Sequence, residues 1–94
     1  MARPINLRQI EIFKAVIEHG TVSRAAEVMA ISHPAASKLL VHLEADTELS
    51  LLDRQKGRLV PTPNALQLYE EVDRIFTSDR QIEIAVQAIK QDFL

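Results

Sequence analysis

The stretch from Thr21 to Asp46, TVSRAAEVMAISHPAASKLLVHLEAD, predicts two helices separated by a short turn. Its first half carries apolar residues at intervals of three and four, the spacing of one buried helical face: Val22, Ala25, Ala26 and Met29. Ile31 and Ser32 interrupt this pattern, and a second period then begins. The stretch therefore indicates a helix, a turn and a second helix.

The second helix has a well-defined predicted start. Ser32 is a good N-cap, because its hydroxyl can accept a hydrogen bond from an otherwise unpaired backbone N–H. Pro34 then lies in the first turn, where a proline costs no helical hydrogen bond. Ala35 and Ala36 are expected to add little bulk to an exposed start, so the helix could approach a grooved partner closely.

The second helix also has two different sides. Three leucines can point inward: Leu39, Leu40 and Leu43. Four residues are expected on or near the opposite side: His33, Ser37, Lys38 and Val41. This arrangement suits a helix that enters a DNA groove. Helical hairpins are common in small all-α proteins, however, so the flanking sequence has to decide.

Composition limits the class of protein. Ninety-four residues, 47% of them hydrophobic, describe one globular domain plus an extension. The chain has no cysteine, which excludes disulfides and thiolate metal sites. No apolar run approaches the ~20 residues that span a bilayer, and the first residues lack the apolar core of a secretory signal. We therefore expect no membrane partner and a cytoplasmic location.

The net charge of −2 is unevenly distributed. Residues 1–62 carry eight Lys and Arg against seven Asp and Glu, whereas residues 63–94 carry three against six. The acidic excess therefore belongs to the last third of the chain. DNA affinity on this background would depend on a few clustered cations and on dimerisation, with phosphate contacts that weaken as salt rises.

The residues before Thr21 predict a core helix. Asn6 is a plausible N-cap, and Gln9 occupies the position that completes a capping box. An apolar stripe follows: Leu7, Ile10, Phe13, Val16 and Ile17. Gly20 can end this helix in the left-handed conformation. Either Thr21 or Ser23 could then cap the next helix.

The segment after the second helix of the pair changes character. Residues 51–54 and 58–60 are predicted to form two very short strands, joined by a tight turn at Gln55-Lys56-Gly57. Three cations lie within five residues at its tip: Arg54, Lys56 and Arg58. Alone, this sequence is typical of a solvated charged turn. Beside a helix-turn-helix, the same hairpin forms a wing that lays cations against DNA.

A long helix is predicted from Thr62, which caps it, and Pro63, which takes its first position. Apolar residues follow at alternating spacings of four and three, a heptad seam broken only by Asp79: Leu68, Val72, Ile75, Ile82, Val86, Ile89 and Phe93. About 30 residues at ~1.5 Å each make a helix roughly 45 Å long, too long for a small core to cover.

The exposed seam needs a partner. We expect a second copy of the chain and a two-fold dimer, although another part of a longer chain could cover the seam instead. A parallel pair in register would bring two Asp79 side chains together, which favours an antiparallel or staggered arrangement.

The run NLRQIEIFKAVIEHGTVSRAAEVMAISHPAASKLLVHLE, followed by LLDRQKGRLVPTPNA, closely resembles the amino-terminal DNA-binding region of LysR-type bacterial transcriptional regulators. The specific features are Phe13 with Gly20, Ala25-Ala26-Glu27, Ser32-x-Pro34-Ala35-x-Ser37, and Leu51-x-Asp53-Arg54 before Pro61-Thr62. The resemblance implies a mainly α fold, with a winged helix-turn-helix of three helices and a two-stranded wing over residues 1–62. A linker and dimerisation helix would follow over residues 63–94.

The resemblance also implies a function. The start of the third helix would enter the major groove of double-stranded DNA at an inverted-repeat promoter site, and the wing arginine would enter the adjacent minor groove. With the wing cations included, the candidate DNA-binding residues are Ser23, Ser32, His33, Pro34, Ser37, Lys38, Arg54, Lys56 and Arg58. The candidate dimerisation residues are Leu68, Val72, Ile75, Ile82, Val86 and Ile89.

The same resemblance places a small-molecule inducer on a larger effector-binding domain, and no cofactor is expected within residues 1–94. The GRLVPT and LYEEVDRIF stretches look most like family members that govern amino-acid or opine metabolism. His33 and Lys38 depart from the usual Gln and Arg, and Glu48 from the usual Gly. A lysine is a point charge without the planar fork of arginine, so it favours phosphate contact over guanine reading.

Two other classes of protein are alternatives to a DNA-binding domain. An enzyme would need a nucleophile with a base, or a ligand cluster, and His19, His33 and His42 lack the spacing of metal ligands, so neither catalysis nor a metal is expected. A protein-interaction module built on the long helix would explain the seam but not the basic wing. DNA binding that weakens steeply with salt would separate these alternatives.

Overall fold

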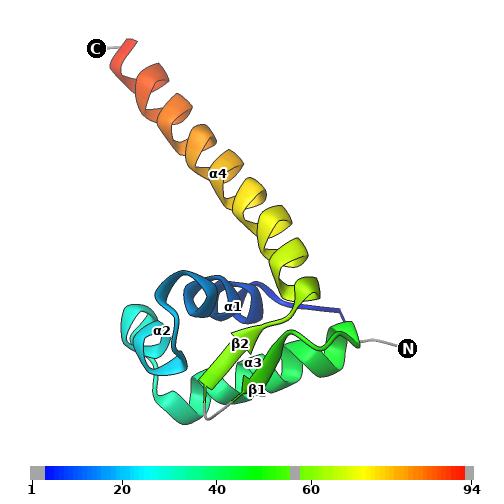
Figure 1. Cartoon of the computed structure of the whole chain (residues 1–94). Helices are drawn as coiled ribbons and strands as arrows, with labels where there is room; N and C mark the ends of the chain where they lie inside the picture. Colours follow the sequence, from blue (N-terminus) through cyan, green and yellow to red (C-terminus); the bar gives the residue numbers. More distant parts are fainter. Residues whose placement is uncertain (1–3, 56–57, 93–94) are drawn as a thin grey trace.

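The computed structural model describes residues 4–55 and 58–92, which form a mainly helical domain with a small sheet and one long projecting helix (Figure 1). The elements within these residues are α1 (Leu7–His19), α2 (Val22–Met29), α3 (His33–Thr47), β1 (Leu52–Gln55), β2 (Arg58–Pro61) and α4 (Pro63–Asp92). The fold class predicted from the sequence, a winged helix-turn-helix followed by a long helix, is confirmed.

The helix starts follow from local side-chain chemistry. The Asn6 side chain accepts a hydrogen bond from the Gln9 backbone N–H at 3.0 Å, and the Gln9 side chain accepts from the Asn6 N–H at 3.1 Å, which completes the predicted capping box. Thr21, rather than Ser23, caps α2, because its Oγ1 accepts from the Arg24 N–H at 3.1 Å. The sequence alone leaves both hydroxyls open as the cap.

Three helices end at residues in the left-handed conformation. Gly20 does so at φ 85°, as predicted, and a glycine adopts this conformation without strain. Ala30 ends α2 at φ 56° and Glu48 ends α3 at φ 59°, and both carry a Cβ that makes this region costly. Glu48 therefore holds a strained backbone conformation in this chain.

The core lies where α1 packs against α2, α3 and α4. Its largest fully buried side chains are Phe13, Ile12, Leu43 and Leu51. Gln9 is also buried, and its Nε2 donates to Asp46 Oδ2 at 2.9 Å, so the buried amide has a partner.

Two sequence predictions about this core are wrong. Leu7 is 66% exposed. It is the first residue of α1, and the buried residues of this helix begin only at Gln9. Ala36 is fully buried instead of lying on the exposed start of α3. Its spacing explains this, since Ala36, Leu40 and Leu43 recur at intervals of four and three on the inward side of the helix.

The two strands pair antiparallel, with Leu52 opposite Pro61 and Arg54 opposite Leu59. Each strand begins or ends one residue later than predicted, and the predicted turn residues Lys56 and Gly57 lie outside the described residues. Thr62 joins the base of this wing to α4. Its Oγ1 donates to the Ser50 carbonyl at 2.6 Å and accepts from the Ala65 N–H at 3.1 Å.

The long helix α4 packs on the domain only through its first turns (Figure 1). Val72 is 4% exposed and Leu68 packs against the core, so these two candidate dimerisation residues are covered by their own chain. Helical spacing places both residues on the seam, but it does not show that the domain itself covers this end of the helix. No described helix has both the length and the apolar content needed to cross a bilayer.

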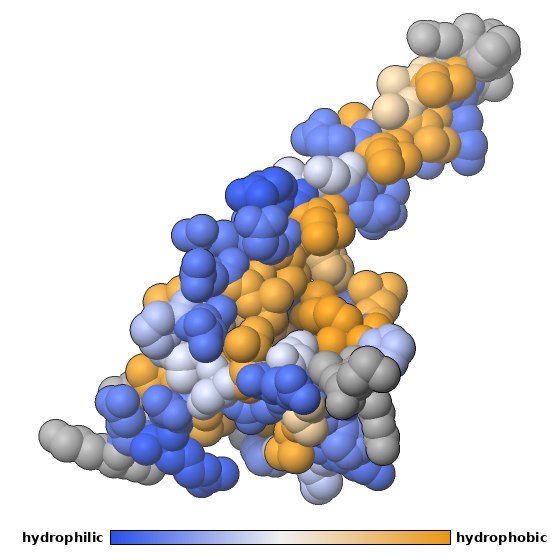
Figure 2. Space-filling model, turned by 90° about the vertical axis from the view of Figure 1, so that its right-hand side faces the viewer, coloured by the Kyte–Doolittle hydropathy of each residue, from blue (hydrophilic) through white to orange (hydrophobic). Residues whose placement is uncertain are grey.

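The outer part of α4 carries apolar side chains that nothing in the described chain covers (Figure 2). They are Ile75, Ile82, Val86 and Ile89 from the predicted seam, together with Ile84. Phe93, the last predicted member of the seam, lies outside the described residues. The exposed part of the predicted dimerisation surface therefore begins at Ile75.

Candidate nucleic-acid interface

The outward side of α3 carries the residues that the sequence placed there. His33, Lys38 and Val41 are exposed, and Ser37 is half-buried. Ser37 Oγ lies 3.4 Å from His33 Nδ1, one helical turn away. The imidazole and the hydroxyl therefore form one polar unit at the start of the helix, and Lys38 adds a cation beside it.

Ser32 and Pro34 shape the first turn of α3. Ser32 Oγ accepts from the Ala35 N–H at 3.2 Å, as the sequence predicted. Because that bond uses only an acceptor lone pair, the Ser32 hydroxyl can still donate to a ligand. Pro34 is exposed and has no N–H. The start of α3 therefore has one unpaired backbone donor less than a helix without proline in its first turn.

A groove of about 640 Å³ lies between α3, the start of α2 and the wing. Four of the candidate DNA-binding residues line it: Ser23, His33, Ser37 and Arg54. Apolar side chains of α3 and the wing, including Leu40 and Leu59, line the rest. Ser32, Pro34 and Lys38 are exposed but do not line this groove.

Arg54 is the wing cation whose side chain the structure describes at this groove. It is exposed on β1, opposite Leu59 of β2. Arg58 begins β2 and pairs in register with Gln55, and Lys56 lies outside the described residues. Of the three cations in the predicted cluster, the structure therefore places only the side chain of Arg54 at the groove.

Glu44 is a functional candidate that the sequence analysis missed. It also lines the groove, and its Oε2 accepts from the N–H of Leu51 at 2.8 Å and of Leu52 at 3.2 Å. These two bonds tie the base of the wing to α3 and occupy the carboxylate with donors from its own chain. No local sequence signal marks such a bond, because it depends on how the chain returns to the helix after Thr47.

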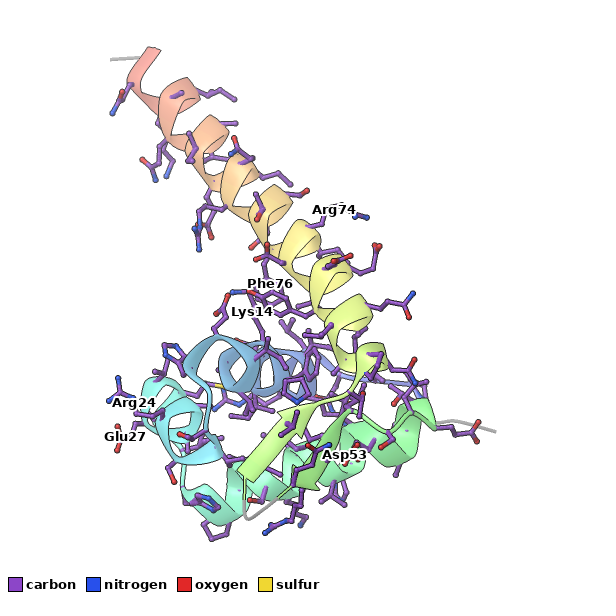
Figure 3. All side chains as sticks on the ribbon, in the orientation of Figure 1. Lys14, Arg24, Glu27, Asp53, Arg74 and Phe76 are labelled. Atoms are coloured by element: carbon purple, nitrogen blue, oxygen red, sulfur yellow. The ribbon has the colours of Figure 1, made fainter. Side chains whose placement is uncertain are left out.

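A second cluster, outside the groove, joins α4 to α1. Glu18 Oε2 accepts from Tyr69 Oη at 2.8 Å and from Lys14 Nζ at 2.8 Å. Lys14 Nζ also lies 5.5 Å from the centre of the Phe76 ring, and Figure 3 shows these two side chains where α1 meets α4. The cluster therefore holds the start of α4 against α1.

The pKa values of this cluster reflect its contacts. The hydrogen bond to the Glu18 carboxylate, with partial burial, raises the pKa of Tyr69 to about 12. Partial burial acts to raise the pKa of Glu18, but the hydrogen bonds from Lys14 and Tyr69 outweigh it and lower that pKa below 4.5. Both shifts favour the charged carboxylate and the neutral phenol.

Among residues 4–55 and 58–92, no group of three or more His, Asp or Glu side chains is arranged to hold a metal ion. The described polar groups that converge are instead hydroxyls, an imidazole, a guanidinium and the Glu44 carboxylate around one groove. Because the Glu44 carboxylate already accepts from Leu51 and Leu52, the groove offers hydrogen-bonding groups and the positive charge of Arg54, which suit an anionic partner.

Comparison with known proteins agrees with this geometry. The family "Bacterial regulatory helix-turn-helix protein, lysR family" matches residues 7–66. The HTH-type transcriptional regulator DgcR of Pseudoalteromonas sp is 39% identical over 87 residues, which cover 93% of this chain and 30% of that protein. The octopine catabolism/uptake operon regulatory protein OccR of Rhizobium meliloti is 44% identical over 72 residues, which cover 77% and 24%.

A solved DNA complex of the BenM DNA-binding domain at catB site 1 is similar in fold, with a TM-score of 0.80 and 25% sequence identity. The match covers 89% of this chain and 94% of that one. The chain spans less than a third of the length of the curated relatives described above. It belongs to the LysR family of bacterial regulatory helix-turn-helix proteins, and it carries that family's winged DNA-binding domain.

Proposed function

We propose that this chain binds an inverted-repeat promoter site as a dimer, with the first turn of α3 in the major groove and the wing in the adjacent minor groove. The observation that carries the proposal is the single groove that His33, Ser37 and Arg54 line together. A helix start and a wing that share one concave surface can follow one stretch of duplex continuously. The relative with a solved DNA complex, BenM, supports duplex DNA as the ligand.

The candidate side chains of α3 and the wing divide into two roles. Lys38 and Arg54 carry positive charges that phosphates attract. Arg54 could instead enter a narrow minor groove, where the negative potential is enhanced. His33 and Ser37 present hydrogen-bonding groups to base edges. Because Ser37 Oγ lies near His33 Nδ1, the other ring nitrogen, Nε2, is the one left to contact DNA. As a donor it would favour the N7 and O6 acceptors of guanine.

The dimer would form through the outer part of α4. Ile75, Ile82, Val86 and Ile89 are exposed at heptad spacing, and burying them against a second copy would remove that apolar surface from water. An antiparallel pair keeps the two Asp79 side chains from meeting in register. Two recognition helices would then lie about one helical turn of DNA apart, or a multiple of it.

The longer relatives suggest a wider role. OccR is named for octopine catabolism and uptake, and we propose that this chain acts within a cytoplasmic regulator whose inducer is an amino acid or an opine. The inducer would bind outside residues 1–94, so this region would need no cofactor of its own. Duplex binding by residues 1–94 should accordingly be the same with and without octopine, whereas a longer protein carrying this region should respond to it.

Random-site selection with residues 1–94, followed by duplex titration at two salt concentrations, tests the proposal. An enriched palindrome, and an affinity that falls steeply with salt, are expected. His33→Gln provides the comparison, because glutamine pairs with adenine and should change the enriched base at one position of each half-site. A dimer that bound no duplex even at low salt would overturn the proposal in favour of a protein-interaction module.

A further inference from the structure

We propose that Val41 is a specificity-determining residue that contacts the C5-methyl group of one thymine in each half-site. The inference rests on the proposed function, and it assigns a role to an apolar side chain that the polar contacts of α3 leave unused. Val41 is 61% exposed, whereas the neighbouring Leu40 and Leu43 are buried. A single exposed valine is ordinary on any protein surface, but Val41 is set apart by its position in the groove.

Val41 lines the same groove as His33, Ser37 and Arg54. Counting from His33, it is the third member of a row at i, i+4 and i+8, so the three side chains follow one side of α3. The row covers about 12 Å along the helix axis at ~1.5 Å per residue. DNA that contacts the polar start of this row would therefore also pass Val41. Since base pairs are stacked ~3.4 Å apart, Val41 would lie at most about three to four base pairs from the start of the row.

The chemistry of the groove singles out a methyl group as the ligand of Val41. Thymine is the base that presents an apolar group, its C5-methyl, in the major groove. A valine in a helix has one strongly preferred χ1 rotamer, so its two methyl groups stay in a defined place. The nearby carboxylate of Glu44 is already bonded to the N–H groups of Leu51 and Leu52. This carboxylate therefore need not accept hydrogen bonds from the donor groups of the bases beside Val41.

The test pairs Val41→Ala with removal of single methyl groups from DNA. A duplex obtained by site selection is remade with each thymine replaced in turn by deoxyuridine, which removes only the C5-methyl group. Val28→Ala is the matched control, because Val28 is a helical valine that is 59% exposed on α2 and does not line the groove. Dissociation constants are measured by fluorescence anisotropy for the three proteins, and circular dichroism confirms that both variants fold.

One thymine per half-site should be sensitive in the wild-type protein, with binding weakened roughly three- to fivefold by the loss of one buried methyl group. Val41→Ala should bind the thymine and deoxyuridine duplexes equally at that position, and Val28→Ala should behave as the wild type. The proposal is overturned if no thymine is sensitive, or if Val41→Ala keeps the full sensitivity at every position. Failure of the wild type to bind any duplex would instead refute the proposed function itself.

Discussion

The hydroxyl oxygen of Tyr69 lies 2.8 Å from Oε2 of Glu18, across the junction between α4 and α1. The same carboxylate oxygen accepts from Lys14 of its own helix at 2.8 Å, so a carboxylate already paired within α1 also bonds to α4. Together with Thr62, which links the wing to the start of α4, this contact fixes the direction in which α4 leaves the domain. In a dimer formed through α4, that direction would set the separation of the two recognition helices.

The first prediction concerns the ionisation of Tyr69, the single tyrosine of a chain without tryptophan. Its pKa of about 12 should appear directly in an alkaline titration of tyrosinate absorbance. Glu18→Gln removes the carboxylate charge and should move the midpoint toward 10. Because the folded pKa is raised, the contact contributes fully below pH 10.0 and is lost as pH rises toward 12. An unshifted midpoint in the folded wild type would show that the contact is absent.

The second prediction concerns acid. Glu18 has a lowered pKa, so its contribution to stability is present above pH 4.5 and is lost as pH falls through the folded value. The free energy of unfolding should therefore fall more steeply with acid in the wild type than in Glu18→Gln. The effect should be small, because the carboxylate is partly solvated. Denaturant titrations of both proteins at neutral and acidic pH measure it, and parallel curves would contradict it.

The third prediction separates cations from base-reading groups. Lys38→Ala and Arg54→Ala should weaken binding to all duplexes by a similar factor. Each should also reduce the magnitude of the slope of log K against log salt by about 1, which is the contribution of one phosphate contact. Arg24→Ala is the control, because Arg24 is an exposed cation on α2 that does not line the groove. If Arg54→Ala left both affinity and slope unchanged, the role assigned to the wing would be wrong.

The fourth prediction distinguishes the two parts of the heptad seam. Val72→Ala should lower the free energy of unfolding by up to roughly 1.5–3 kcal/mol without weakening association, because Val72 is buried within its own chain. Ile82→Asp should instead abolish the dimer and leave the fold intact, since Ile82 is 63% exposed. Sedimentation equilibrium measures association, and Thr77→Asp, which adds the same charge on the other side of α4, is the control.

The fifth prediction concerns the end of α3. Glu48 holds a left-handed φ of 59°, which costs about 1–2 kcal/mol for a residue with a Cβ. Glu48→Gly removes this strain, and the greater freedom of glycine in the unfolded chain offsets part of the gain. The net effect should be a stabilisation of up to about 1 kcal/mol, visible as a higher denaturant midpoint. A lower midpoint would show that the Glu48 side chain makes a stabilising contact.

Much of the fold could be predicted from the sequence because its signals are local. The capping box of Asn6 and Gln9, the left-handed Gly20 and the N-cap at Ser32 each depend on residues within one turn of each other. The outward side of α3 followed from helical spacing alone. The assignment of its residues to DNA contact came instead from the family resemblance.

The contacts that position the site could not be predicted in this way. Glu18 and Tyr69 are 51 residues apart, and Gln9 and Asp46 are 37 apart, so each pair depends on how helices cross. The burial of Val72 likewise depends on how α4 packs on the rest of the domain. A periodic pattern shows which residues share a face, but not which surface covers that face.

The most direct test of the central claim is a titration of isotope-labelled residues 1–94 with the selected duplex, followed through amide chemical shifts. We expect the largest shifts at residues 32–41 of α3 and at Arg54, with the core of α1 nearly unchanged. Shifts confined to α4, with residues 32–41 unmoved by saturating duplex, would contradict the account.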